Sequence, residues 1–198
     1  MGSKGAEENV HMRYAKRIAA AVAAVIALPA LACAATIGGV WYAPQYDYTD
    51  FWVAADNKPF QVVVHGNPFP NVPFDEVAQA LLPAMQVAKP RPNLTFTYSK
   101  PSEDPRPYYR LVLVFDYAND LGSDAVCQGT YRTGPAKPGV FKVFAVYCRN
   151  DMTMSTTTAW TPATGPDDPR IQQLFRELFM VVFSDATFLR PQSGTDRR

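Results

Sequence analysis

The sequence has few of the side chains that active sites use most. Its 198 residues include only three cysteines and two histidines, and the formal net charge is +1. The charges are not gathered into blocks of one sign, which argues against a nucleic-acid-binding protein because such proteins present a basic face. Prolines, 18 in number, exceed the 11 glycines and separate apolar runs. They therefore mark turns between elements and not a low-complexity tract.

Motifs that identify a reaction are also lacking. The sequence has no G-x-S-x-G element, no phosphate-binding glycine loop and no dinucleotide fingerprint. Asp47, Asp50 and Asp56 do not have the spacing of a calcium-binding EF-hand loop. The neighbouring pair Asp167 and Asp168 is explained by capping of the helix that follows. We therefore expect a protein that is not an enzyme and that needs no cofactor and no metal ion.

The N-terminal region has the three-part layout of a secretory signal peptide. Met12–Arg17 is short and basic, Ile18–Ala32 is uncharged and apolar, and small residues follow. The apolar run is shorter than the roughly 20 residues of a membrane span, although counting on to Val40 leaves a retained anchor as an alternative. Because the basic stretch begins at Met12, either translation starts there or the preceding residues are an upstream extension.

The end of this region resembles the signal of a bacterial lipoprotein precursor. Such signals close with leucine, a small residue, and alanine or glycine before a cysteine that receives lipid. Ala32-Cys33 keeps this pattern, whereas Ala30 and Leu31 depart from it. The resemblance implies lipidation of Cys33, attachment to a bacterial membrane and a location in the cell envelope facing the periplasm. Ala30-Leu31-Ala32 also fits ordinary A-x-A cleavage, which would release a soluble periplasmic protein. A cysteine buried in a core helix fits poorly, because the segment has no polar face.

The two remaining cysteines, Cys127 and Cys148, are expected to form a disulfide in an oxidising compartment. Ala125–Arg132 and Val140–Cys148 are both interpreted as strands, joined by a segment rich in turn residues. As a hairpin they would bring the two thiols within bridging distance. The closed loop predicts a stabilisation of about 3 kcal/mol. Two separate buried thiols are the alternative.

Apolar patterning predicts a single α+β domain over residues 59–189, a mostly antiparallel sheet with two helices packed on one face. Helices are predicted at Pro73–Gln86, ending or kinking early at Pro83, and after the N-cap Asp168. Residues 34–58 are interpreted as an irregular, aromatic-rich lead-in, and residues 190–198 as a disordered tail. Besides the two expected cysteine strands, the predicted strands are Pro59–Gly66, Leu94–Lys100, Tyr108–Tyr117 and Met152–Trp160.

These features favour an exported cell-envelope protein that acts as a non-enzymatic accessory or binding module for an unknown envelope protein. The segment containing "YCRND…GPDDPR" before the last helix resembles uncharacterised proteobacterial envelope lipoproteins, a likeness that implies no activity. Two alternatives remain open. One is a periplasmic hydrolase with its site around His65. The other is a small-ligand carrier that uses the uncovered face of the sheet, with aromatic residues between Trp41 and Trp52.

Overall fold

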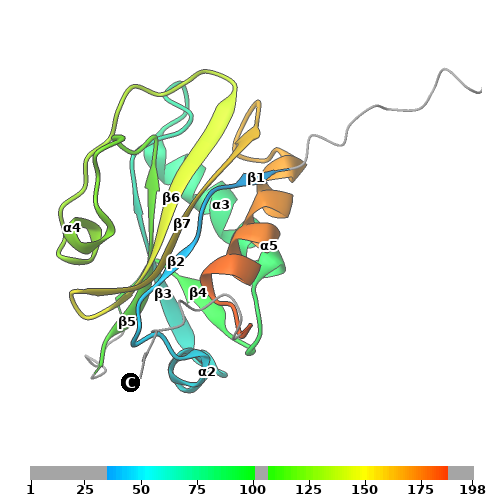
Figure 1. Cartoon of the computed structure of the whole chain (residues 1–198). Coiled ribbons are helices and arrows are strands. Elements are labelled where there is room, and N and C mark those ends of the chain that lie inside the picture. Colours follow the sequence, from blue (N-terminus) through cyan, green and yellow to red (C-terminus); the bar gives the residue numbers. More distant parts are fainter. Residues whose placement is uncertain (1–34, 101–106, 187–198) are drawn as a thin grey trace, which may run out of the picture. The chain divides into compact units, whose positions relative to one another are not determined.

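A computed structural model describes residues 35–100 and 107–186 (Figure 1). Seven strands form one sheet in the order β1-β7-β6-β5-β3-β4, and β2 also pairs with β7. The strands are β1 (Thr36–Ile37), β2 (Trp41–Tyr42), β3 (Pro59–His65), β4 (Thr95–Thr97), β5 (Tyr109–Phe115), β6 (Val140–Arg149) and β7 (Met152–Pro162). The helices are α2 (Tyr48–Ala55), α3 (Phe74–Ala88), α4 (Ser123–Cys127) and α5 (Pro169–Val182).

The fold is α+β, as the sequence predicts, but the sheet is mixed. Strands β5, β6, β7, β1 and β2 pair antiparallel, whereas β3 pairs parallel with both β4 and β5. The expectation of a mostly antiparallel sheet is wrong at β3. The reason is that α3 carries the chain from the end of β3 back to the start of β4, and such a crossover joins parallel strands.

Helices α3 and α5 cover the same face of the sheet, as expected (Figure 1). Asp168 caps α5, and Pro169 is its first residue. Pro83 lies inside α3, which continues to Ala88, so the early end predicted there is wrong. Pro83 and Gln79 are both exposed. Water can therefore reach the Gln79 carbonyl that the proline leaves without its helical donor.

The opposite face of the sheet carries a second, smaller core. Val126 and Cys127 of α4 pack there with Val112, Phe144 and Val146, among others. The strand expected at Ala125–Arg132 is therefore wrong, and there is no hairpin between it and β6. Gly122 begins the turn of helix instead, and Asp124 lies in its first turn, where a carboxylate is favourable.

The N-terminal part of the described chain belongs to the domain and is not an irregular lead-in. Strands β1 and β2 pair with β7 along its outer edge. Asp47 caps α2 by accepting a hydrogen bond from the Thr49 amide at 2.8 Å. The ring of Phe51 stacks on Phe183, with centroids 4.2 Å apart. This segment was misinterpreted because two-residue strands have no periodicity and are held only by pairing with a distant part of the chain.

The signal segment and the predicted tail lie outside the described residues. Within the residues described, no helix has both the length and the apolar character needed to cross a membrane.

Candidate functional site

The predicted disulfide is present and buried. Cys127 of α4 and Cys148 of β6 are bonded, with Cα atoms 5.6 Å apart and a sequence separation of 21. Both residues are at most 1% exposed. The bond therefore fastens α4 to the second face of the sheet. The prediction names the correct two cysteines, but the bond joins a helix to a strand and not the two strands of a hairpin. Cys33, the predicted lipidation site, lies outside the described residues.

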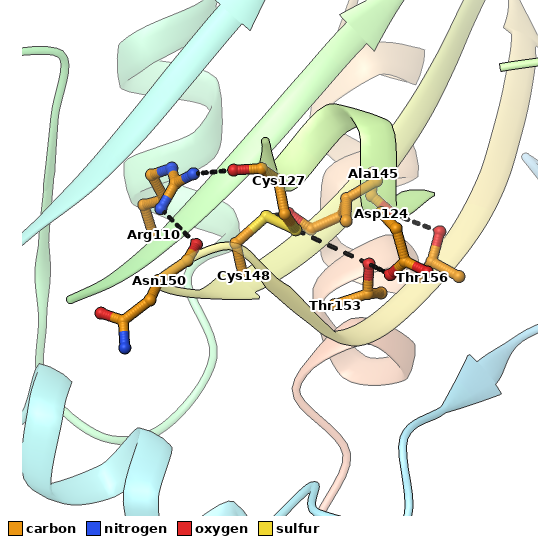
Figure 2. The surroundings of a disulfide bond; sticks show 9 residues. Arg110, Asp124, Cys127, Ala145, Cys148, Asn150, Thr153 and Thr156 are labelled. Carbon is orange, nitrogen blue, oxygen red and sulfur yellow. Dashed lines mark hydrogen bonds between the residues drawn. A yellow bond between two sulfur atoms is a disulfide. The ribbon is translucent and has the colours of Figure 1, made fainter. Parts of the chain in front are cut away.

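Hydrogen bonds hold α4 on both sides of the disulfide (Figure 2). On one side, Arg110 donates to the Cys127 carbonyl at 2.5 Å and to the Asn150 carbonyl at 2.9 Å. On the other, the Thr153 hydroxyl donates to the Asp124 carboxylate at 2.8 Å. Because the two sulfurs are bonded to each other, neither is a thiolate that could act as a nucleophile. The disulfide and these hydrogen bonds hold α4 on the sheet.

His65, the residue around which a hydrolase site was considered, ends β3. Its imidazole stacks on Tyr131, with ring centroids 3.4 Å apart. Burial lowers the pKa of His65, which favours the neutral ring. Within the described part of the chain, the imidazole makes no hydrogen bond to a carboxylate or hydroxyl that would prepare it for proton transfer. The arrangement is that of a packed histidine.

Asp116 is a buried carboxyl that sequence reasoning did not single out. It follows β5 directly, has a φ of 45° and is 5% exposed. Its Oδ2 has no hydrogen-bond partner among the described residues. Burial raises the pKa of Asp116, while the positive charge of Lys142 acts in the opposite direction. The carboxyl is thus poorly solvated as an anion.

A cavity lies where α2 meets the start of β3, the start of β5 and the end of β6. It measures about 370 Å³. Tyr109 and Arg149 are directly paired across β5 and β6 at this end of the sheet. The lining combines charged and polar side chains with an apolar wall: Asp50, Val53, Ala54, Lys58, Pro59, Phe60, Gln61, Pro107, Tyr109 and Arg149. We call it the α2 cavity.

A shared carboxylate organises the polar side of the α2 cavity. Tyr109 donates its hydroxyl to Asp50 Oδ2 at 3.1 Å, and Arg149 Nη1 lies 3.5 Å from the same oxygen. The guanidinium also lies over the Tyr109 ring, 5.9 Å from its centroid. Burial, followed by the negative charge of Asp50, raises the pKa of the Tyr109 hydroxyl. Tyr109 therefore stays protonated and acts here as a hydrogen-bond donor.

Two further polar side chains line the same cavity. The Lys58 ammonium donates to the Val53 carbonyl at 2.7 Å. Gln61 is nine-tenths buried, and its Nε2 donates only a long hydrogen bond of 3.4 Å to the Tyr98 carbonyl. Its Oε1 is buried without a partner among the described residues. The described lining of the α2 cavity thus carries two cations against one carboxylate.

The other acidic residues considered from the sequence have separate structural roles. Asp47 caps α2, and Asp168 caps α5 by accepting from the Arg170 amide at 3.0 Å. Over residues 35–100 and 107–186, no group of three or more histidine, cysteine, aspartate or glutamate side chains is placed to hold a metal ion.

The aromatic residues proposed for a ligand carrier do not gather around one cavity. Tyr42, Tyr46 and Phe51 are buried in the main core. Trp41 instead lines a hollow of about 350 Å³ beside α4, with Asp124 and Met152. The α2 cavity was missed because its charged residues come from positions 50, 58 and 149, which are far apart in the sequence. The one local signal was Asp47-x-x-Asp50, typical of a helix start.

In comparisons with known proteins, no family model matches the chain, and no curated protein matches it.

Proposed function

We propose that this chain is an exported protein of the bacterial cell envelope, attached to the membrane through lipid on Cys33, and that it acts there as a non-enzymatic binding module. The observation that carries the proposal is the buried disulfide between Cys127 and Cys148. Disulfides of this kind persist in oxidising compartments such as the bacterial periplasm and are rare in the cytosol. The signal-like segment before Cys33 supports the same route.

The side chains most able to do chemistry support binding in preference to catalysis. Cys127 and Cys148 are held in their disulfide, and His65 is stacked on Tyr131. The α2 cavity offers charges and hydrogen bonds around an apolar wall, which is the usual composition of a ligand site. We therefore assign the binding role to this cavity.

Metabolic labelling with radiolabelled palmitate tests the attachment. We expect the full chain, expressed in a Gram-negative host, to take up label and to sediment with membranes. The Cys33→Ala variant should lose both properties, whereas a Cys127→Ala/Cys148→Ala variant should keep the label. Label-free protein in the periplasmic fraction would support simple cleavage and contradict the lipid. Wild-type-like membrane attachment of the Cys33→Ala variant would also contradict it.

Non-reducing mass mapping of protein isolated from the envelope tests the compartment. We expect one peptide pair joined by Cys127 and Cys148. Free thiols at both positions in freshly isolated protein would contradict export into an oxidising compartment, whatever the result of the palmitate labelling.

A further inference from the structure

We infer that the α2 cavity binds a small organic monoanion, a carboxylate joined to an apolar body of the size of one amino-acid residue. This inference deepens the proposed binding role, on which it rests, and is independent of the lipid attachment. It is carried by the juxtaposition of Lys58 and Arg149 with an apolar wall in one cavity of about 370 Å³.

The charge of the cavity selects a monoanion. Among the described residues, Lys58 and Arg149 contribute two positive charges and Asp50 one negative charge, so the described lining has a net charge of about +1. Asp50 is already engaged by the Tyr109 hydroxyl. A ligand with one negative charge would neutralise the described lining, whereas a dianion would leave an excess negative charge beside Asp50.

The geometry around Arg149 favours a carboxylate as the anionic group. A guanidinium is a planar fork that pairs with carboxylate oxygens through two hydrogen bonds. Asp50 takes a single, long contact of 3.5 Å from Nη1, so the residues that the structure describes leave most of the N–H donors of Arg149 for a ligand. The Tyr109 ring beneath the guanidinium and the Asp50 carboxylate beside it restrict its orientation. Asp50 and Tyr109 therefore act as positioning residues.

The remaining wall defines the rest of the ligand. Val53, Ala54, Pro59, Phe60 and Pro107 provide an apolar surface suited to an aliphatic side chain. A carboxylate joined to an aliphatic side chain is therefore the ligand chemistry that the described lining fits.

N-acetyl-leucine is a probe that carries both features, the carboxylate and the aliphatic side chain, and N-acetyl-leucinamide has the same shape without the charge. We expect N-acetyl-leucine to shift backbone amide signals of the ¹⁵N-labelled, oxidised full-length protein saturably, at α2, at the start of β3 and at Arg149. N-acetyl-leucinamide should bind about tenfold more weakly or worse, because it lacks the charged acceptor. Inorganic phosphate should not compete.

Variants distinguish this site from adventitious binding. Arg149→Gln should weaken N-acetyl-leucine binding about tenfold or more. The matched control Arg132→Gln removes another surface arginine, which pairs with Asp120 at 2.8 Å, and should bind as wild type does. Because the same spectra report folding, loss of binding can be separated from loss of structure.

Three results would overturn the inference: equal binding of N-acetyl-leucinamide, unchanged binding by the Arg149→Gln variant, or no saturable shift at millimolar probe. If the protein is found in the envelope but the probe fails, the ligand class is wrong and the envelope location stands. If palmitate labelling fails but the probe binds in the α2 cavity, the attachment is wrong and this site stands.

Discussion

Arg110 donates a hydrogen bond to the carbonyl oxygen of Cys127 at 2.5 Å, so the residue that carries one half of the disulfide is also held through its backbone. The same guanidinium reaches the Asn150 carbonyl just beyond the end of β6. Cys148 lies directly opposite Arg110 in the pairing of β5 with β6. A covalent bond and a buried cation thus fasten the five-residue helix α4 from neighbouring positions on one face of the sheet.

Removing the disulfide should destabilise the domain by about 3 kcal/mol, the value expected for a loop of this length. The change is Cys127→Ala/Cys148→Ala, and the measurement is the free energy of unfolding from urea titration. Adding reductant should lower the stability of the wild-type protein and leave the double variant unchanged. If reductant lowered the stability of the double variant by the same amount, the loss of stability in the wild-type protein would not come from reduction of the disulfide.

Replacing Arg110 by methionine should lower the free energy of unfolding, measured by urea titration, by about 2–3 kcal/mol. The reason is that two carbonyl oxygens in a buried setting lose their charged hydrogen-bond donor. Arg132→Met is the matched control, since Arg132 pairs with Asp120 at an exposed site, and its cost should not exceed about 1 kcal/mol. Combined with the disulfide variant, Arg110→Met should cost less than the sum of the two changes, as both hold α4. Full additivity would contradict a shared role.

Asp116→Asn should stabilise the protein at neutral pH by roughly 1 kcal/mol, because a buried, poorly partnered carboxylate is replaced by a neutral amide. Asparagine also tolerates the positive φ found here. Because burial raises the pKa of Asp116 above its usual 3.8, the wild-type domain loses stability as the pH rises from 3.8 through the folded-state pKa.

Urea titrations of both proteins across this pH range measure the effect of Asp116. The gain from Asp116→Asn should be small below pH 3.8 and should reach a plateau at neutral pH. An equal gain at every pH would indicate a change in packing and not in ionisation.

Asp168→Ala should lower the free energy of unfolding by about 1–2 kcal/mol, because the variant loses the N-cap of α5. Asp168 also bonds the Arg170 guanidinium and the Thr164 amide. These hydrogen bonds, that of Arg170 first, hold the pKa of Asp168 well below its usual 3.8. The stabilisation is therefore complete above about pH 4 and is lost as the pH falls below that value.

Thermal or urea unfolding at neutral and acid pH measures the α5 cap, and Asp167→Ala is the control because Asp167 is exposed and lies outside the cap. The Asp168→Ala variant should lose less stability on acidification than the wild type does. An equal cost for the two alanine variants would contradict the capping role.

Elements with strong local patterns could be predicted from the sequence. The continuous apolar run in β5 and the Asp168-Pro169 start of α5 place both elements close to their observed bounds. The parallel pairing of β3 was not predicted, because the order of strands along the chain does not determine whether two paired strands run parallel or antiparallel. It could have been inferred from the helical crossover between β3 and β4.

Short elements held by distant partners could not be predicted in this way. Strand β1 exists because Thr36 and Ile37 pair with Trp160 and Ala159, more than a hundred residues later. The segment at Ala125–Arg132 is rich in residues that favour strands, but burial of Val126 and Cys127 on the sheet overrides that preference. The α2 cavity depends on the same long-range pairing, which brings Arg149 beside Tyr109.

The position of β1 leaves almost no stalk between a lipid on Cys33 and the folded domain. Only Ala34 and Ala35 lie between Cys33 and Thr36, so three Cα–Cα steps give a reach of at most about 11 Å. Thr36 and Lys142 both lie beside Trp160 in the sheet. Arg149, which lines the α2 cavity, lies seven residues further along β6, roughly 24 Å away. Figure 1 shows β1 and α2 at opposite ends of the domain. An anchored molecule would therefore rest with its β1 end against the bilayer and its cavity facing outward, so that it would meet ligands at a nearly fixed height of one domain above the membrane.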